Sequence, residues 1–155
     1  MFSKKFKIKT EPFINKNKPI LFSLGRLDYN KNNIMLLRAY NKIKDKIRCN
    51  IVLMGDGNEK NMLLDYAKKN NFEKNLFIFS FQKNPYPYFS KSDILILTSR
   101  TEGLPNVLIE ALALKKFVIS TKCPTGPKEI LLNGKAGVLV NNDDYEDLAN
   151  KIRIY

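Results

Sequence analysis

Residues 94–113 read ILILTSRTEGLPNVLIEALA, and this stretch indicates the fold. It opens with consecutive apolar residues, a run too short for a helix and typical of a strand that is buried on both faces. A polar loop containing Gly103 follows. Pro105 then stands where a helix should begin, because proline is well tolerated at the first helical position. A strand, a loop and a helix in this order form the repeating unit of α/β proteins.

The same unit recurs on both sides of this stretch. Short apolar runs predict strands at residues 20–24, 51–54, 76–79, 94–98, 117–120 and 137–140. Apolar spacings of three or four residues and helix-start residues predict helices over 34–47, around 62–67, over 105–114, from Pro127, and from Asn142 through Ile152. Apolar strands that alternate with helices predict an α/β fold, a doubly wound, Rossmann-like parallel sheet of about six strands.

The length and composition fit one globular domain. The chain has 155 residues, of which 44% are hydrophobic and 27% are charged. We expect residues 19–155 to form this domain and the lysine-rich residues 1–18 to be a basic lead-in or a linker remnant. The net charge of +12 raises nucleic acid or an anionic membrane as a partner. However, the 22 Lys, 18 Asn and 15 Ile residues indicate an AT-rich genome as the origin of much of this charge.

The absence of histidine, together with only two cysteines, excludes several kinds of catalytic site. The chain alone can build neither a Ser-His-Asp nor a Cys-His nucleophile system, and no Cys/His zinc site reaches four ligands. Cys49 and Cys123 are expected to be reduced thiols of a cytoplasmic protein. No apolar run approaches the roughly 20 residues that a membrane-spanning helix needs. The basic start lacks the apolar stretch of a secretory signal.

Two loops hold the polar residues that we expect at the functional site. In a doubly wound sheet, ligands bind beyond the carboxyl ends of the strands where the strand order reverses, and the first and fourth strands are neighbours there. The loop after the first strand reads GRLDYNK over residues 25–31, and the loop after the fourth reads SRTEGLPN over residues 99–106. We therefore expect the two loops to face one crevice.

The start of the helix after Pro105 is predicted to hold an anion. The N–H groups of Asn106, Val107 and Leu108 should be free in the first helical turn, where the helix dipole favours a phosphate. Gly103 should let this backbone approach a ligand closely.

Charged side chains around this predicted anion site suit a nucleotide sugar. Glu102 and Glu110 flank the helix start, and a carboxylate accepts hydrogen bonds from pairs of sugar hydroxyls. Arg26 and Lys31, from the facing loop, would supply positive charge to a diphosphate. Each of these residues taken alone would be read as ordinary surface charge.

Three segments together resemble glycosyltransferase family 4, the retaining enzymes of GT-B fold. The segments are GRL at 25–27 with Lys31, EGLPNVLIEA at 102–111 and GPKEI at 126–130. The resemblance covers roughly residues 19–150 and is to the carboxyl-terminal, donor-binding half of these enzymes. Its most specific feature is the pair of glutamates separated by seven residues, which follows the Arg and the Lys in order.

The resemblance implies a role for each matching residue. The catalytic set would be Arg26, Lys31 and Glu102, of which the two cations hold the donor diphosphate and Glu102 positions the transferred sugar. Glu110 would bind the ribose, and the backbone at residues 106–108 would meet phosphate. The remaining donor contacts would come from Gly25, Gly103, Phe81 and Gln82, the last two lying where the base is bound. No general base is visible, and Glu102 would position the sugar rather than act as a nucleophile.

The resemblance also implies a substrate and partners. The donor would be a nucleotide sugar, typically a UDP-linked hexose or N-acetylhexosamine, used without a metal or other cofactor in the assembly of bacterial capsules, lipopolysaccharides and related glycans. The glycan or lipid-linked acceptor would bind an amino-terminal domain that no part of this chain supplies. We therefore expect the chain alone to bind donor and to transfer little or nothing, in the cytoplasm or at the inner face of the membrane.

The chain departs from the family pattern at two further places. Ser80 stands where the family commonly has glycine. Lys115-Lys116-Phe117 stands where the family has Gly-Lys-Pro, so the helix after Glu110 lacks its usual glycine terminator.

Other interpretations stay open at this point. Binding of nucleic acid would explain the charge but not the loop motifs, and we do not expect it. A catalytically silent domain that serves only as a partner for another subunit is a third interpretation. The segment GDG at 55–57 is predicted to be a turn, and the aromatic segment 86–89 a packed short helix. Glu129 fits a helix-start acid and a donor contact equally well.

Overall fold

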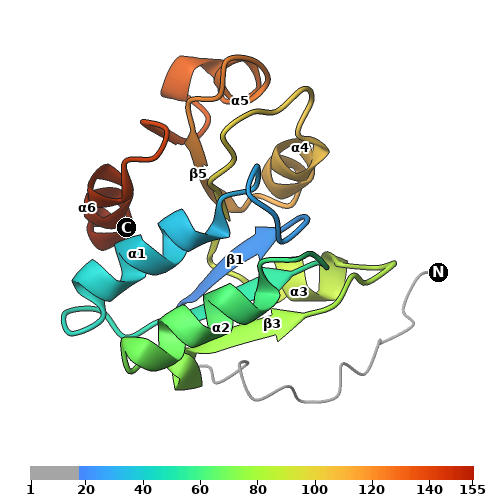
Figure 1. The fold of residues 1–155 in the computed structure, drawn as a ribbon. Coiled ribbons are helices and arrows are strands. Elements are labelled where there is room, and N and C mark those ends of the chain that lie inside the picture. The colour runs from blue at the N-terminus through green and yellow to red at the C-terminus, as the bar shows by residue number, and fades with distance from the viewer. Residues whose placement is uncertain (1–17) are drawn as a thin grey trace.

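The computed structural model describes residues 18–155, so the predicted lead-in lies outside the described residues except for Lys18. Six parallel strands form one sheet in the order β3-β2-β1-β4-β5-β6. The strands are β1 (Ile20–Leu24), β2 (Asn50–Met54), β3 (Leu76–Phe79), β4 (Ile94–Leu97), β5 (Phe117–Thr121) and β6 (Val138–Val140). The chain order reverses between β1 and β4, which are hydrogen-bonded neighbours. The predicted doubly wound sheet is confirmed (Figure 1).

Helices cover both faces of this sheet. The helices are α1 (Asn33–Ile43), α2 (Lys60–Lys69), α3 (Tyr86–Lys91), α4 (Asn106–Ala113), α5 (Pro127–Ile130) and α6 (Tyr145–Ile154), with short 3-10 helices η1 (Glu73–Asn75) and η2 (Leu132–Gly134). One core cluster joins α1, α2 and α6 to the sheet, and a second joins α3, α4 and the end of α5 to the other face. The strands are mostly apolar because both of their faces are buried, and their few polar residues, Ser23, Asn50, Ser120 and Thr121, are buried as well.

Alternation along the strands sends neighbouring side chains into different clusters. In β1, Leu21 packs in the first cluster and Phe22 in the second, as expected from the two-residue period of a strand. Phe22 is fully buried, and its ring contacts that of Phe89 from α3 edge to face, with 5.0 Å between the ring centroids. The predicted short aromatic helix is therefore confirmed as α3. Each such fully buried side chain contributes about 1.5–3 kcal/mol of transfer free energy.

The helix boundaries differ from the predictions by a few residues. The helix predicted to reach residue 47 ends at Ile43. Pro105 has a ψ angle of 87°, which is not helical, so it caps α4 from outside and Asn106 is the first helical residue. Pro127 does occupy the first turn of its helix, as predicted. At the start of α6 the side chain of Asp144 accepts a hydrogen bond from the Asp147 N–H at 2.9 Å, a regular N-cap.

α4 is terminated by a residue of left-handed conformation although that residue is a lysine and not a glycine. Lys115 adopts a left-handed conformation with φ of 55°. The Lys116 N–H donates to the Ala111 carbonyl, and the Lys115 N–H donates to the Leu112 carbonyl, each at 2.9 Å. These two bonds form a Schellman motif with lysine at the position that favours glycine. Among residues 18–155, no helix has the length and apolar content needed to cross a membrane.

Candidate functional site

A pocket of about 630 Å³ opens at the carboxyl edge of the sheet. Its walls come from the ends of β1 and β2, the loops that follow β1, β2 and β3, and the helices α3 and α4. The predicted site residues Gly25, Arg26, Phe81, Gln82 and Glu110 all line it. The structure thus brings together residues that lie more than 80 positions apart, from Gly25 to Glu110, at the predicted edge of the sheet.

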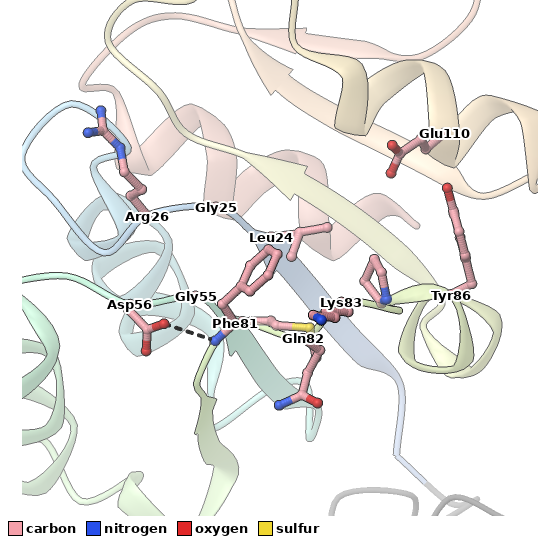
Figure 2. A pocket seen from close by; sticks show the side chains of 12 residues that line it. Leu24, Gly25, Arg26, Gly55, Asp56, Phe81, Gln82, Lys83, Tyr86 and Glu110 are labelled. Atoms are coloured by element: carbon pink, nitrogen blue, oxygen red, sulfur yellow. Dashed lines mark hydrogen bonds between the residues drawn. The ribbon is translucent and has the colours of Figure 1, made fainter. Parts of the chain in front are cut away.

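Figure 2 shows how these side chains are arranged around the pocket. Glu110 reaches down from α4, and the hydroxyl end of Tyr86 points up toward it. Arg26 lies on the opposite side of the pocket. Its side chain is 75% exposed and pairs with Asp28 through a 3.1 Å contact from Nε to Oδ2. The guanidinium therefore stands in solvent at the rim, within reach of a ligand that enters the pocket.

Lys31 and Glu102 form an ion pair immediately beside the pocket. The Lys31 Nζ lies 2.5 Å from the Glu102 Oε1, and the two side chains are 21% and 10% exposed. The Ser99 hydroxyl donates to the same carboxylate oxygen at 2.5 Å. Neither Lys31 nor Glu102 lines the 630 Å³ pocket itself.

Gly25 lies at the boundary between the pocket and this ion pair. It lines the pocket, and a Cβ placed on it would lie 3.3 Å from the Lys31 Cε. The aliphatic part of Lys31 thus packs against the Gly25 backbone. The four predicted residues lie in two adjacent places: Arg26 and Glu110 line the pocket, and Lys31 and Glu102 pair on the other side of Gly25.

The first turn of α4 offers fewer free donors than predicted. The Leu108 N–H donates to the Pro105 carbonyl at 2.9 Å, so the prediction that it is free is wrong. The physical reason is that Pro105 lies outside the helix as its cap, which places its carbonyl within reach of the third helical residue. Asn106 is exposed and Val107 is half-buried at this turn. A Cβ on Gly103 would meet no atom within 4 Å, so the space beside Gly103 is open.

The segment 55–57 does more than turn the chain. A Cβ on Gly55 would lie 2.0 Å from the Gly25 carbonyl oxygen, and one on Gly57 would lie 2.1 Å from the Leu27 carbonyl oxygen. The Leu27 N–H donates to the Asp56 carbonyl at 2.9 Å. Only glycine lets the loop after β2 pack this closely against the loop after β1. Sequence reasoning missed this role, although two glycines after the strand next to β1 were a signal for it.

The loop after β3 is hydrogen-bonded to the loop after β2. The Phe81 N–H donates to the Asp56 carboxylate at 3.2 Å, the dashed line in Figure 2. The Phe81 ring is largely exposed. The hydrogen bond fixes the backbone of this loop while the ring of Phe81 stays accessible at the pocket.

Ser99, which bonds Glu102, is itself buried and held by two buried residues, Thr121 and Cys123. The Ser99 carbonyl accepts from the Thr121 hydroxyl at 2.6 Å and from the Cys123 thiol at 3.1 Å. These bonds fix the backbone from which the Ser99 hydroxyl reaches Glu102. Burial raises the pKa of the Cys123 thiol. Both cysteines are free and buried. Among the described residues, no three His, Cys, Asp or Glu side chains gather closely enough to hold a metal ion.

Comparison with known proteins identifies the group to which this arrangement belongs. Residues 4–155 match the family described as "Glycosyl transferases group 1". An uncharacterized glycosyltransferase of Methanocaldococcus jannaschii is 38% identical over 119 residues, which are 76% of this chain and 29% of that protein. A Campylobacter jejuni N-acetylgalactosamine-N,N'-diacetylbacillosaminyl-diphospho-undecaprenol 4-alpha-N-acetylgalactosaminyltransferase is 38% identical over 124 residues, 80% of this chain and 33% of that enzyme. The chain thus spans about a third of the length of these relatives.

Solved structures agree on the fold. The crystal structure of Anabaena HepE in complex with UDP and glucose superposes with a TM-score of 0.82 at 22% identity. The match covers 94% of this chain and 43% of HepE.

Proposed function

Because the chain belongs to the group 1 glycosyl transferases, we propose that it binds the nucleotide-sugar donor of a glycosyltransferase at the carboxyl edge of its sheet. One observation carries the proposal. On the two sides of Gly25 lie a pocket with aromatic and carboxylate lining and a nearly buried lysine–glutamate pair. A nucleotide sugar has a matching order of chemical groups, with a base and ribose at one end and a diphosphate and sugar at the other.

The pocket suits the nucleoside. The exposed Phe81 ring offers a face for stacking, and the neighbouring Gln82 offers an amide that can both donate and accept. Glu110 accepts hydrogen bonds only, so it suits the two hydroxyls of a ribose. Glu110 comes from the opposite wall, across from the loop that carries Phe81 (Figure 2). The volume of about 630 Å³ falls in the usual range for small-molecule sites.

The other side of Gly25 suits the diphosphate and the sugar. Lys31 has three donors, so it can keep its bond to Glu102 and also contact a phosphate. Arg26 at the rim and the first turn of α4 add positive potential. When the bond between sugar and nucleotide breaks, negative charge develops on the departing diphosphate, and these groups stabilise it. The proposal needs no metal ion for this step.

Glu102 is assigned the task of holding the sugar rather than attacking it. Its Oε1 is held by Lys31 and Ser99, which fixes the carboxylate before a ligand arrives. A carboxylate fixed in this way orients a sugar hydroxyl and so places the anomeric carbon for attack by the acceptor. Retention of configuration then follows from attack on the face that the nucleotide leaves.

We propose a UDP-linked hexose or N-acetylhexosamine as the donor and a bacterial surface glycan as the product. Two findings support this choice. The Campylobacter jejuni relative is named for the transfer of N-acetylgalactosamine to an undecaprenol-linked acceptor, and the HepE structure contains UDP and glucose. Because the chain spans about a third of such relatives, the glycan or lipid-linked acceptor is assigned to protein outside this chain.

A thermal-shift panel of UDP, GDP, ADP and their common sugars tests the proposal. UDP at 100 times its Kd stabilises the folded state by about 2.7 kcal/mol, or roughly 5–10 °C for a domain of this size. Glu110→Ala should lower the UDP response, because it removes the ribose contact. Glu73→Ala changes an exposed glutamate of η1, away from the pocket, and should leave the response as in the wild type.

Two results would contradict the proposal. One is a melting temperature that no nucleotide changes. The other is a response to short DNA or RNA at about 0.15 M salt that exceeds the response to UDP, because nonspecific contacts to nucleic acid weaken at that salt concentration.

A further inference from the structure

Arg100 lies in the β4–α4 loop, and its side chain connects three loops. Its guanidinium lies over the Tyr29 ring, with Cζ 4.0 Å from the ring centroid. Its Nη1 donates to the Tyr29 carbonyl, and its Nη2 pairs with the Asp143 Oδ1 at 2.9 Å. Tyr29 belongs to the β1–α1 loop and Asp143 to the loop before α6. The Arg100 side chain is only 23% exposed, so these contacts are partly shielded from solvent.

The backbone beside Arg100 joins the same two loops a second time. The Arg100 N–H donates to the Asn30 carbonyl at 2.8 Å. The Asn30 side chain in turn donates to the Thr101 carbonyl at 3.0 Å. Its Oδ1 accepts from the Thr101 N–H at 3.2 Å and from the Thr101 hydroxyl at 2.6 Å. The pairs Tyr29–Asn30 and Arg100–Thr101 thus form one continuous contact between the loops.

This contact is adjacent in sequence to both members of the ion pair described above. Lys31 follows Asn30, and Glu102 follows Thr101. On the far side of Lys31, the Asn32 amide donates to the Asp143 Oδ1 at 2.9 Å. The same Asp143 oxygen therefore holds Arg100 and Asn32 together. Both neighbours of Lys31 are therefore connected to Arg100. Asn30 accepts directly from the Arg100 N–H, and Asn32 is connected through Asp143.

Given the function proposed above, we propose that Arg100 is a positioning residue for the diphosphate and sugar end of the donor site. It does not touch the proposed ligand position itself. It acts by holding the β1–α1 and β4–α4 loops in the register that places Lys31 against Glu102. Binding groups need to be held within about 0.5 Å of their productive geometry, and that is achieved by supporting contacts of this kind.

The base end of the site is supported differently. The loop with Phe81 and Gln82 is held by Asp56 through the Phe81 N–H, and Asp56 is bonded to the β1–α1 loop at Leu27, before the Tyr29–Asn30 segment that contacts Arg100. Loss of the Arg100 side chain should therefore weaken the binding of diphosphate and leave the binding of nucleoside unchanged. A purely structural role for Arg100 would affect both ligands alike.

NMR titrations of the 155-residue chain with UDP and with uridine separate these effects, because they also measure weak binding. Arg100→Ala should weaken the binding of UDP about tenfold or more, the loss expected when a charge-assisted hydrogen bond to phosphate is weakened. Its Kd for uridine should match that of the wild type. Arg100→Lys should recover part of the UDP affinity, because lysine keeps the charge but lacks the planar group that stacks and pairs at once.

Lys42→Ala is the matched control. Lys42 also pairs with a carboxylate, 3.0 Å from the Glu146 Oε1, and lies 5.8 Å from the centroid of the Tyr145 ring, but it joins α1 to α6 away from the pocket. Its variant should bind UDP as the wild type does. If Arg100→Ala does not fold, Asp143→Asn provides the test, since it weakens the Arg100 pair and should change UDP affinity in the same direction.

The outcomes are distinguishable. A wild-type chain that does not bind UDP refutes the proposed function. A wild type that binds UDP, with Arg100→Ala or Asp143→Asn binding it equally well, overturns the role of Arg100 alone. Equal losses for UDP and uridine in these variants also overturn it.

Discussion

Lys115 has a backbone conformation that costs an ordinary residue about 1–2 kcal/mol and costs glycine little. Its φ of 55° ends α4 directly after the segment that carries Glu110. Lys115→Gly should therefore raise the free energy of unfolding by about 1 kcal/mol, because the cost relieved at positive φ exceeds the entropy that glycine adds to the unfolded chain. The melting temperature should rise by about 2–4 °C. Calorimetry or urea denaturation measures this change.

The control for this prediction is Lys115→Ala. Alanine removes the same side chain but keeps the Cβ that is unfavourable at positive φ. Its stability should be equal to or below that of the wild type. A stabilisation of equal size in the alanine and glycine variants would show that the lysine side chain, and not the backbone, is unfavourable at this position.

Gly103 is predicted to matter for binding and not for stability. Outside the two neighbouring residues, no atom lies within 4 Å of a Cβ built at this residue, so alanine fits the folded chain. Gly103 directly follows Glu102 and precedes the first residue of α4, Asn106, by three positions, in the loop where the proposal places the sugar and diphosphate. Gly103→Ala should keep the melting temperature within about 2 °C of the wild type and lower the affinity for a UDP-sugar several-fold. Unchanged affinity would mean that the ligand does not approach this backbone.

Single residues were the hardest level to predict from sequence. Arg26 and Glu110 line one pocket as expected, because their loops follow from the strand order. The state of the Leu108 N–H was predicted wrongly, because it depends on the ψ angle of Pro105, which the residue type does not fix. The sharing of one Glu102 oxygen by Lys31 and Ser99 was also not predictable, because it depends on side-chain positions across two loops.

The packing of the loops after β1 and β2 gives a prediction at the scale of elements. A Cβ on Gly55 would lie 2.0 Å from a backbone oxygen of Gly25, and backbone cannot move aside cheaply. Gly55→Ala should lower the free energy of unfolding by about 2 kcal/mol or more and also weaken UDP binding, because Gly25 borders both parts of the site. Denaturation together with a UDP titration checks both effects. Wild-type stability in this variant would contradict the described packing.

The elements themselves were largely predictable. The strands are short apolar runs between polar loops, and the all-parallel sheet follows from their alternation with helices. The links between elements were not. The network of Arg100, Asn30 and Asp143 consists of polar residues in loops, where no periodicity indicates which side chains meet. Such residues are read as solvated surface until the strand order places their loops together.

Buried ionisable groups give the whole molecule a pH dependence at its alkaline limit. Burial raises the pKa of Cys49 from 9.0 to about 12, and burial together with the nearby Cys49 raises the pKa of Tyr40 from 10.0 to about 12. The unfolded chain therefore loses these protons at lower pH than the folded chain. Stability should be fully present below pH 9 and should fall as the pH rises toward 12.

Urea denaturation midpoints between pH 7 and pH 11 measure this dependence. Cys49→Ala should be less stable than the wild type at pH 7, because it leaves a small cavity, but its stability should fall less steeply above pH 9. The same alkaline slope in both proteins would show that the thiol does not contribute.

The central claim is that a nucleotide sugar binds at the carboxyl edge of the sheet. A second pocket, of about 580 Å³, lies at the opposite edge, where Leu21, Asp93 and Phe117 line it at the amino ends of strands. The most direct test is a titration of the ¹⁵N-labelled chain with UDP, followed amide by amide. We predict saturable shifts that include Gly25, Arg26, Phe81 and Asn106 and leave the opposite edge unchanged. Shifts that gather around Asp93 and Phe117, or that do not saturate, would contradict the claim.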